Sequence, residues 1–423
     1  MPRKTREPGI YENELKKGKS SFRIKVSMRN PHTGKAEPYY ETVNGTYSDA
    51  KRRKRELLDQ VDKGLSVHRK LTLSEWAELW LRGYSYRWRN KTKERYLEII
   101  NKHILPYRGD VELSQLSPAS IADLYSVLRR EGKIVRNRQG EVTGTSGLSE
   151  RTILHVHRAL SLMLKWAVND DKLLKNPCDK VVTPKPLKRR WTNASGESQG
   201  NMLALSKEQL RKLVTSFSGT IYFPIVVLAA ATGMRRGEIL GLRWQDVDLT
   251  KRVLKVWNAL EETKLEGVRL DRPKNRASER TIGIDETTVR VLKEHKAREE
   301  SAARALGLKL SSEHPVFRVQ VHNEVSAESF FKFVRPSTVT GAFINVARGI
   351  EGDPIFKSMR FHDLRHTHAS LLIDAGVPVT DVSQRLGHSD PAITLSVYSH
   401  FFKNSEERIL RVTEGIMGQA LLG

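Results

Sequence analysis

A change of composition near the middle of the chain limits its fold more than any other feature. Residues 171–205 contain prolines at positions 177, 184 and 186, a basic run at 188–190, and a polar stretch rich in Ser, Gly and Asn at 193–200. Such composition is typical of a linker, because it offers no apolar period that a core could bury. We therefore expect the 423 residues to form separate domains, with the linker itself at 186–205.

The first 66 residues predict a small domain of mixed structure. Residues 22–29 alternate apolar and basic side chains, which predicts a half-buried strand with a basic outer face. Residues 39–43 predict another strand, and Ser48 can cap a helix that runs to Asp62. We expect a small three-stranded sheet plus one helix over residues 1–66. The alternative is a solvated basic tail, against which the alternation argues.

Residues 67–185 predict an all-helical domain. The sequence Thr72-Leu-Ser-Glu75 matches a capping box, which marks the start of a helix. Apolar residues at helical spacing predict three more helices, one from 90 to a stop near Pro106, one after Pro118 and one after Ser149. These apolar stripes are interpreted as core positions rather than ligand sites.

The remainder of the chain predicts helices interspersed with hairpins. Residues 221–231 form an apolar segment that ends at Thr232-Gly233, and residues 253–257 and 280–284 look like strands. We expect residues 206–423 to be a mixed, mainly helical domain with a small antiparallel sheet and a C-terminal tail helix. The complete chain is thus predicted to be a multidomain α+β protein.

The charge of the chain indicates a polyanionic partner. Lys and Arg number 73 against 49 Asp and Glu, which gives a net charge of +24 and a pI near 10.0. Residues 1–66 carry a net +7 and residues 67–190 a net +12, whereas the longer remainder carries only +5. Nucleic acid is the commonest such polyanion. The basic run of the first domain is a candidate DNA-binding element and consists of Lys51, Arg52, Arg53, Lys54 and Arg55.

A membrane surface is the rival partner for a basic chain, and the sequence argues against it. No apolar run is long enough to span a bilayer, and no apolar stretch follows the first residues as in a signal peptide. The single cysteine, Cys178, excludes internal disulfides and fits a reducing cytoplasm.

Two arginines, two histidines and one tyrosine stand in a fixed order in the last domain. Arginine and histidine side chains can hold and titrate a phosphodiester, and a tyrosine among them is a candidate nucleophile. The first arginine lies near a predicted helix N-terminus, where backbone amides and the helix dipole favour an anion. In chain order the residues are Arg235, His362, Arg365, His388 and Tyr398.

The sequence motifs around these residues resemble those of the tyrosine recombinase (phage integrase) family. The resemblance rests on the segments 231–238 (ATGMRRGE), 361–370 (FHDLRHTHAS) and 386–400 (LGHSDPAITLSVYSH). It also implies a catalytic lysine in a hairpin turn, here Lys274, although Asn275 replaces the usual threonine and Lys264 is an alternative. The implied catalytic set is Arg235, Lys274, His362, Arg365, His388 and the nucleophile Tyr398, supported by Glu238 and His400.

The resemblance implies a function and a set of partners. The enzyme would cut and rejoin DNA through a 3′-phosphotyrosine intermediate, and so integrate and excise a mobile element. Because one phosphodiester is exchanged for another, no nucleotide is needed, and the chain has no phosphate-binding loop of the Gly-x-x-x-x-Gly-Lys-Ser/Thr kind. We expect no cofactor.

Residues 1–66 resemble an arm-binding domain and residues 67–185 a core-binding, SAM-like domain. The implied partner is double-stranded DNA, at core and arm attachment sites, bound by a homotetramer. A host DNA-bending protein and an excision factor are further expected partners. The expected location is the cytoplasm of a bacterial host, at the nucleoid.

Several alternatives stay open at this point. A chromosome or plasmid dimer resolvase, or a type IB topoisomerase-like enzyme, would use the same phosphotyrosine chemistry. A non-catalytic DNA-binding regulator would have an incomplete residue set. His362 and His366 are four residues apart on one helix face, as in some metal sites, but the glutamate of a His-Glu-x-x-His motif is absent and Arg365 would repel a cation.

Overall fold

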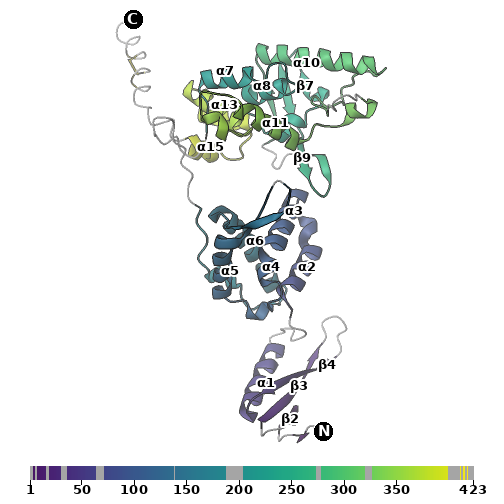
Figure 1. Ribbon diagram of the computed structural model, residues 1–423, viewed down its shortest axis with the longest axis vertical. Coiled ribbons are helices and arrows are strands. Elements are labelled where there is room, and N and C mark those ends of the chain that lie inside the picture. Colours follow the sequence, from purple (N-terminus) through teal and green to yellow (C-terminus); the bar gives the residue numbers. More distant parts are fainter. Residues whose placement is uncertain are drawn as a thin grey trace. The chain divides into compact units, whose positions relative to one another are not determined.

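The computed structural model shows a mixed α+β protein, as predicted (Figure 1). It forms two compact units, Met1–Leu187 and Lys188–Gly423. The described residues are 3–4, 7–15, 19–29, 36–62, 71–137, 139–186, 203–272, 278–319, 326–398, 410, 413, 414 and 417. Most of the predicted linker and of the predicted tail helix therefore lies outside the described residues.

The N-terminal part of the first unit is an antiparallel sheet with one helix on it. Its elements are β1 (Arg3–Lys4), β2 (Ile10–Leu15), β3 (Lys19–Arg29), β4 (Ala36–Asn44) and α1 (Tyr47–Asp62). The sheet has four strands in sequence order rather than the predicted three, because the short β1 pairs with β2. The alternation along β3 was interpreted correctly: Phe22, Ile24 and Val26 are buried, while Arg23 and Lys25 are exposed.

The helix α1 begins at Tyr47, two residues earlier than a cap at Ser48 would place it. Thr46 and Asp49 hydrogen-bond reciprocally around its first turn, with the Thr46 amide donating to Asp49 at 3.0 Å. The helix packs on β3 and buries Ala50 and Leu57 against the strand residues. This small core is separate from the cores that follow.

The second part of the first unit is built mainly from helices around its own core. They are α2 (Leu73–Tyr84), α3 (Asn90–Ile99), α4 (Leu105–Arg108), α5 (Pro118–Glu131) and α6 (Glu150–Asn169). The predicted capping box is present, with Thr72 and Glu75 bonding each other's backbone amides. The core includes Trp76, Trp80, Leu124, Leu160 and Met163.

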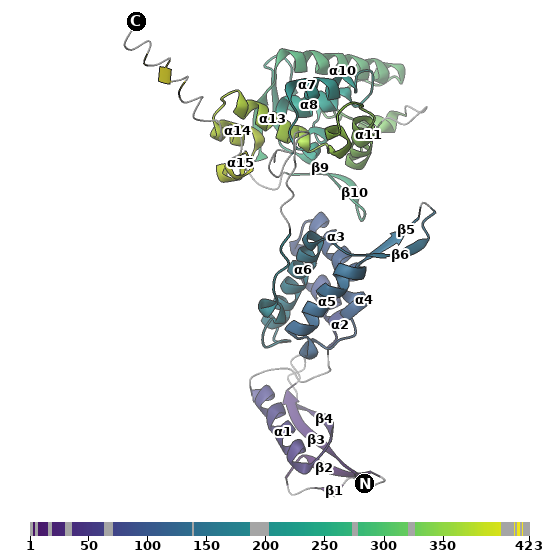
Figure 2. The same ribbon diagram turned by 60° about the vertical axis from the view of Figure 1, so that its left-hand side comes forward.

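One prediction for this part was wrong. The helix predicted to stop near Pro106 does end there, at Arg108, after a π-helical turn at Ile100–Ile104 that joins α3 to α4; proline occupies the first turn of α4 and needs no amide bond. The part is not all-helical, however, because a hairpin of β5 (Lys133–Arg136) and β6 (Val142–Ser146) projects between α5 and α6 (Figure 2). The residues of this hairpin are mostly polar and lack a clear period, so no sequence pattern indicated it.

The second unit is mainly helical with small antiparallel sheets. The helices are α7 (Lys207–Thr215), α8 (Phe223–Thr232), α9 (Arg236–Leu240), α10 (Glu286–Ala305), α11 (Pro336–Arg348), α12 (Ile355–Ser358), α13 (Asp363–Asp374), α14 (Val379–Leu386) and α15 (Pro391–Tyr398). The strands are β7 (Val247–Asp248), β8 (Val253–Val256), β9 (Ala259–Thr263), β10 (Gly267–Asp271) and β11 (Arg280–Gly283). They form a sheet in the order β11-β8-β7 and a separate β9–β10 hairpin.

The apolar helix α8 is central to the arrangement of the site. It is hydrophobic on all sides, as expected for a buried helix, and α13 packs against it. It ends at Gly233, whose φ of +65° is a left-handed conformation that favours glycine. A side chain there would meet both His368 of α13 and Leu386 of α14 at 2.7 Å. Gly233 therefore allows the C-terminal ends of α8 and α14 to meet closely beside α13.

Candidate active site

Arg235 lies at the N-cap position of α9, directly after the turn at Gly233. Its guanidinium donates to Glu238 at 2.8 Å and to the Gly387 carbonyl at 3.3 Å, and its backbone amide donates to Glu238 at 2.9 Å. The side chain keeps 38% of its surface exposed, so it can still contact a ligand. The neighbouring Arg236 donates to Thr340 of α11 instead and so points away from Arg235's partners.

Glu238 joins two arginines from different segments. Its side chain is only 3% exposed, and its second oxygen accepts from Arg280 of β11 at 3.0 Å. Burial alone would raise the pKa of Glu238, but the charges and hydrogen bonds of Arg280 and Arg235 lower it below its ordinary value. The carboxylate is therefore ionised and fixes the direction of Arg235.

Arg365 is buried in the first turn of α13 and connects three helices. Its guanidinium donates to the Gly233 carbonyl at the end of α8 and to the Leu386 carbonyl at the end of α14, both at 2.8 Å. Main-chain carbonyls at helix C-termini lack helical partners and carry partial negative charge. Arg365 satisfies two of them and brings its own positive charge into the site.

His388 follows Gly387, which ends α14 in the left-handed conformation. Its Nδ1 is 2.7 Å from the hydroxyl of Thr394 on α15, and Thr394 is fully buried. Burial, and then the charges of Arg365 and Arg235, lower the pKa of His388 to about 4. The imidazole is therefore neutral near pH 7 unless an anion binds beside it.

His362 directly precedes α13. Burial, and then the nearby charge of Arg365, lower the pKa of its imidazole. It lies edge-on to His366, with ring centres 4.9 Å apart. Burial and the neighbouring His362 lower the pKa of His366 to about 3. Among the described residues, no group of three or more His, Cys, Asp or Glu side chains is placed to hold a metal ion.

His368 has a hydrogen-bonding role between α8 and α14. Its Nδ1 lies 2.8 Å from the Ala230 carbonyl, and its Nε2 lies 3.1 Å from Arg385 Nε. The arginine donor requires Nε2 to accept, which leaves the proton on Nδ1 for the carbonyl. Burial and the charge of Arg385 lower the pKa of His368 to about 4.

Three of the predicted site residues cannot be placed by their side chains. Lys274 and His400 lie outside the described residues. Tyr398 ends α15, the helix whose Thr394 contacts His388, but its side chain is also outside the described part. The structure thus brings together Arg235, Glu238, His362, Arg365 and His388.

The sequence analysis missed two arginines that support this site. Arg280 donates to the Arg385 carbonyl at 2.7 Å and to Ser278, in addition to Glu238. Arg385 donates to the carbonyls of Ala231 and Gly283, both at 3.1 Å. Nothing in the spacing of either residue along the sequence indicated these contacts between distant segments.

The assembled geometry suits an anion with tetrahedral oxygens. Two guanidinium groups are held by the main-chain carbonyls of Gly233, Leu386 and Gly387, and the half-buried imidazole of His388 is held by the Thr394 hydroxyl. These donors can stabilise charge that develops on non-bridging oxygens. Such an arrangement can support transfer of a phosphoryl group to a nucleophile on α15.

Comparison with known proteins identifies this arrangement. Residues 204–405 match the Phage integrase family, and residues 72–128 match the N-terminal SAM-like domain of phage integrases. The chain belongs to the phage integrase family. It is therefore a tyrosine recombinase. Enzymes of this class carry out site-specific DNA recombination.

Relatives and solved structures agree with the assignment. The chain is 27% identical over 402 residues to a tyrosine recombinase XerC-like protein of Caldanaerobacter subterraneus subsp. tengcongensis, covering 92% of this chain and 94% of the relative. It is 26% identical to the ICEBs1 integrase of Bacillus subtilis, covering 74% of each. Its fold is similar to that of the Tn1549 transposon integrase, solved with a circular intermediate DNA, at a TM-score of 0.59 and 19% identity over 81% of this chain and 99% of that one.

A further basic surface lies on the helical part of the first unit. The pKa of His155 is lowered by burial and then by the charges of Arg95, Arg151 and Arg158. The side chains from α3 and α6 therefore share one face, on which positive charge is concentrated. The spacing of Arg151, His155 and Arg158 fits one side of a helix, so the sequence contained this signal.

In the described part of the chain, no helix is long and apolar enough to cross a membrane.

Proposed function

We propose that this tyrosine recombinase integrates and excises a mobile element through a 3′-phosphotyrosine intermediate. The observation that carries the proposal is the convergence of Arg235, Arg365 and His388 beside the helix that bears Tyr398. In this reading Tyr398 attacks the scissile phosphorus. The two arginines and His388 stabilise the charge on the non-bridging oxygens.

Proton transfer completes the proposed mechanism. His362 accepts the tyrosine proton, since its lowered pKa leaves the imidazole free to act as a base near neutral pH. Lys274 protonates the departing 5′ oxygen, and His400 supports the site next to the nucleophile. Glu238 holds Arg235 in place. The reverse attack by a 5′ hydroxyl from another duplex gives strand exchange without a cofactor.

We divide the chain into three DNA-handling domains. Residues 1–66 form an arm-type DNA-binding domain, 67–185 a core-binding domain and 206–423 the catalytic domain, with a linker at 186–205. The basic face made by Arg95, Arg151 and Arg158 supports core binding by the helical part.

The proposed arm-binding role has support from the sheet as well as from α1. Most of the basic run on α1 is paired within the domain: Lys54 reaches Glu7 and the Pro8 carbonyl, and Arg53 pairs with Glu41. Lys51 and Arg52 also form ion pairs, with Glu7 and Asp49, while Arg55 is exposed. The open sheet face adds Arg23, which stacks on Tyr40 at 4.4 Å, and Lys25. We propose both surfaces for arm DNA.

We extend the proposal to partners and location. The active assembly is a homotetramer on two DNA sites, assisted by a host DNA-bending protein and an excision factor. The relatives that match come from bacteria and bacteriophages, which supports action in a bacterial cytoplasm at the nucleoid. The basic N-terminal domain favours an integrase over a dimer resolvase or a topoisomerase-like enzyme.

Covalent trapping tests the proposal directly. The full chain is incubated with a nicked duplex that carries the junction sequence of its element, so that the cut strand is lost and the adduct accumulates. We expect a protein–DNA adduct with the wild type and none with Tyr398→Phe, which should bind the same duplex with nearly unchanged affinity. An adduct formed by the Phe variant would remove Tyr398 as the nucleophile.

A further inference from the structure

The β5–β6 hairpin stands out from the helical part of the first unit without a core of its own (Figure 2). Ile134 is 59% exposed and Val142 58% exposed, and most other residues of the two strands are exposed as well. An isolated two-stranded hairpin is marginally stable in water at best. Such an element needs either a rigid attachment or a partner that covers it.

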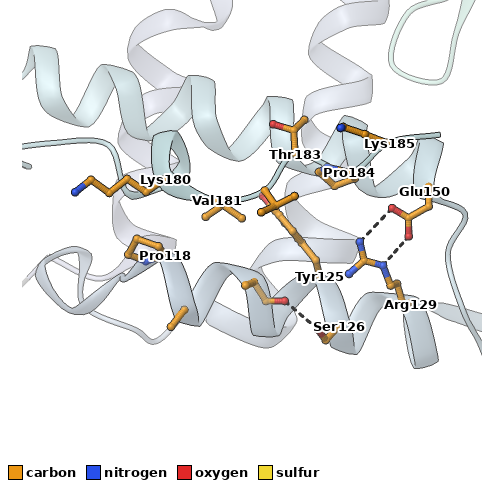
Figure 3. Close-up of a pocket in the computed structure, with 13 residues that line it drawn as sticks. Pro118, Tyr125, Ser126, Arg129, Glu150, Lys180, Val181, Thr183, Pro184 and Lys185 are labelled. Atoms are coloured by element: carbon orange, nitrogen blue, oxygen red, sulfur yellow. Dashed lines mark hydrogen bonds and ion pairs between the residues drawn. The ribbon is translucent and has the colours of Figure 1, made fainter.

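The attachment is rigid. Arg129 at the end of α5 donates two bonds to Glu150 at the start of α6, at 2.6 and 3.1 Å, beside a groove of about 670 Å³ (Figure 3). The Leu148 amide donates to the Leu128 carbonyl at 2.9 Å. A side chain at Gly147 would lie 1.9 Å from the Arg129 carbonyl, so only glycine fits. The two ends of the hairpin, where it joins α5 and α6, are therefore held together, and this attachment sets the direction of the hairpin.

The tip of the hairpin is also shaped by its own bonds. Arg136 donates to the Gly140 carbonyl at 2.8 Å, and the Asn137 side chain donates to Glu141 at 2.8 Å. Glu141 is the one acidic residue between positions 133 and 146, and this bond engages it. The remaining polar side chains of the described strands are the cations Lys133 and Arg136 and the hydroxyls of Thr143, Thr145 and Ser146, of which Thr143 donates to the Val135 carbonyl at 3.3 Å.

The size and chemistry of the hairpin suit a groove of double-stranded DNA. Strands in a pair lie about 4.8 Å apart, and the major groove, about 12 Å wide, admits a two-stranded ribbon. Gly144 faces Val135 across the pair, which keeps the ribbon thin at its middle. Lysine, arginine and threonine are donors that contact phosphates and base edges.

A protein partner fits these observations less well. A stable protein interface buries about 800 Å² on each side with an apolar centre. The described strands offer only two strongly exposed large apolar side chains, Ile134 and Val142. The hairpin also leads directly into α6, whose Arg151 and Arg158 belong to the basic face described above.

We propose that the β5–β6 hairpin is a two-stranded ribbon that reads DNA. It enters a groove of the same duplex that α3 and α6 bind, next to the contacts of these helices. The inference rests on the proposed function, because it assumes that the helical part binds the core site. The hairpin would contact bases of the core site that the helices alone do not contact. Lys133 and Arg136 contact the phosphates that border the groove.

The test compares three forms of the full chain. One carries Lys133→Gln and Arg136→Gln, a second replaces the strands by a short Gly-Asn turn, and the control carries Lys172→Gln and Lys175→Gln, two exposed lysines of the same unit. Salt-dependent affinity is measured on a short random-sequence duplex, and hydroxyl-radical footprints on the junction duplex. Far-UV circular dichroism and thermal melts confirm that the variants are folded.

We expect the hairpin substitutions to lower the slope of log K against log salt by about 1.8, since each phosphate contributes about 0.9. They and the turn variant should also lose protection at one edge of the footprint, which the control keeps. Unchanged slopes and footprints would refute the ribbon. So would an unchanged footprint combined with loss of complexes that hold two DNA sites, because the hairpin would then contact protein. Covalent adducts are measured in the same samples. If the adduct forms while the slopes and footprints are unchanged, the hairpin proposal fails and the proposed function does not.

Discussion

Replacing Glu238 by glutamine should destabilise the catalytic unit far more than a single charge change at the surface. The carboxylate is 3% exposed and accepts from the Arg235 amide, the Arg235 guanidinium and Arg280 at 2.8 to 3.0 Å. Glutamine keeps the volume but loses the charge, and its NH₂ group faces one of the donors. Breaking a buried ion pair on one side costs about 3–5 kcal/mol. We expect about 3 kcal/mol here, because one acceptor oxygen is retained.

The assay is hydrogen exchange of the full chain, resolved by peptide, in increasing urea. This measurement gives the free energy of unfolding separately for the peptides of α8 and α9. It therefore does not assume a single unfolding transition for a chain of several domains. The matched control is Glu286→Gln, which breaks an exposed pair with Arg252 at 3.0 Å. An exposed pair contributes about 0–1 kcal/mol, so the control should change little.

The pH dependence gives a second check with a definite sign. The pKa of Glu238 is lowered in the folded chain, so its stabilisation is present above the ordinary carboxyl value of 4.5 and is lost as pH falls through the folded pKa. The difference between wild type and Glu238→Gln should therefore shrink in acid. Equal, small effects of the two substitutions at neutral pH would refute the argument that Glu238 fastens Arg235 to Arg280.

Three further predictions concern chemistry and binding. Lys274→Ala should slow single-turnover cleavage by about 10²–10⁴, with Lys264→Ala as control, and a sulfur at the 5′ leaving position should restore much of the rate; no rescue would give Lys274 another role. Deleting residues 1–66 should preserve the adduct on a core site but remove a distal footprint on the full attachment region, and identical footprints would contradict an arm-binding domain. DNA binding should take up a proton below neutral pH, because a phosphate would raise the pKa of His388 that burial and Arg365 hold at about 4. Calorimetry in buffers of different ionisation heat measures this uptake. Without DNA, the unfolded chain binds more protons between pH 6.5 and about 4, so stability should fall as pH is lowered through that window.

The sequence predicted those parts of the structure that a local pattern specifies. The capping box at Thr72 and the alternation along β3 each depend on neighbouring residues, and both are present. The family resemblance added the order of the site residues, and the structure brings Arg235, Arg365 and His388 to one place.

The parts that were not predicted depend on contacts between distant segments. Arg280 and Arg385 act through carbonyls that lie more than 100 residues away along the chain, so no local pattern marks them. The short strand β1 exists only through its pairing with β2. The β5–β6 hairpin has no buried face, and a periodicity argument requires one side to be buried.

The anchoring of the site through main-chain carbonyls has a consequence for sequence variation. Arg365 and Arg385 bind the carbonyls of Gly233, Ala231, Leu386 and Gly283, and every amino acid offers such an oxygen. Substitutions at these acceptor positions should therefore be tolerated wherever the side chain itself is not confined. Two positions are confined: Gly233 has a left-handed φ and close neighbours that exclude a side chain, and Leu386 is fully buried. A library randomised at these four positions should recover many residues at 231 and 283, apolar residues at 386 and only glycine at 233.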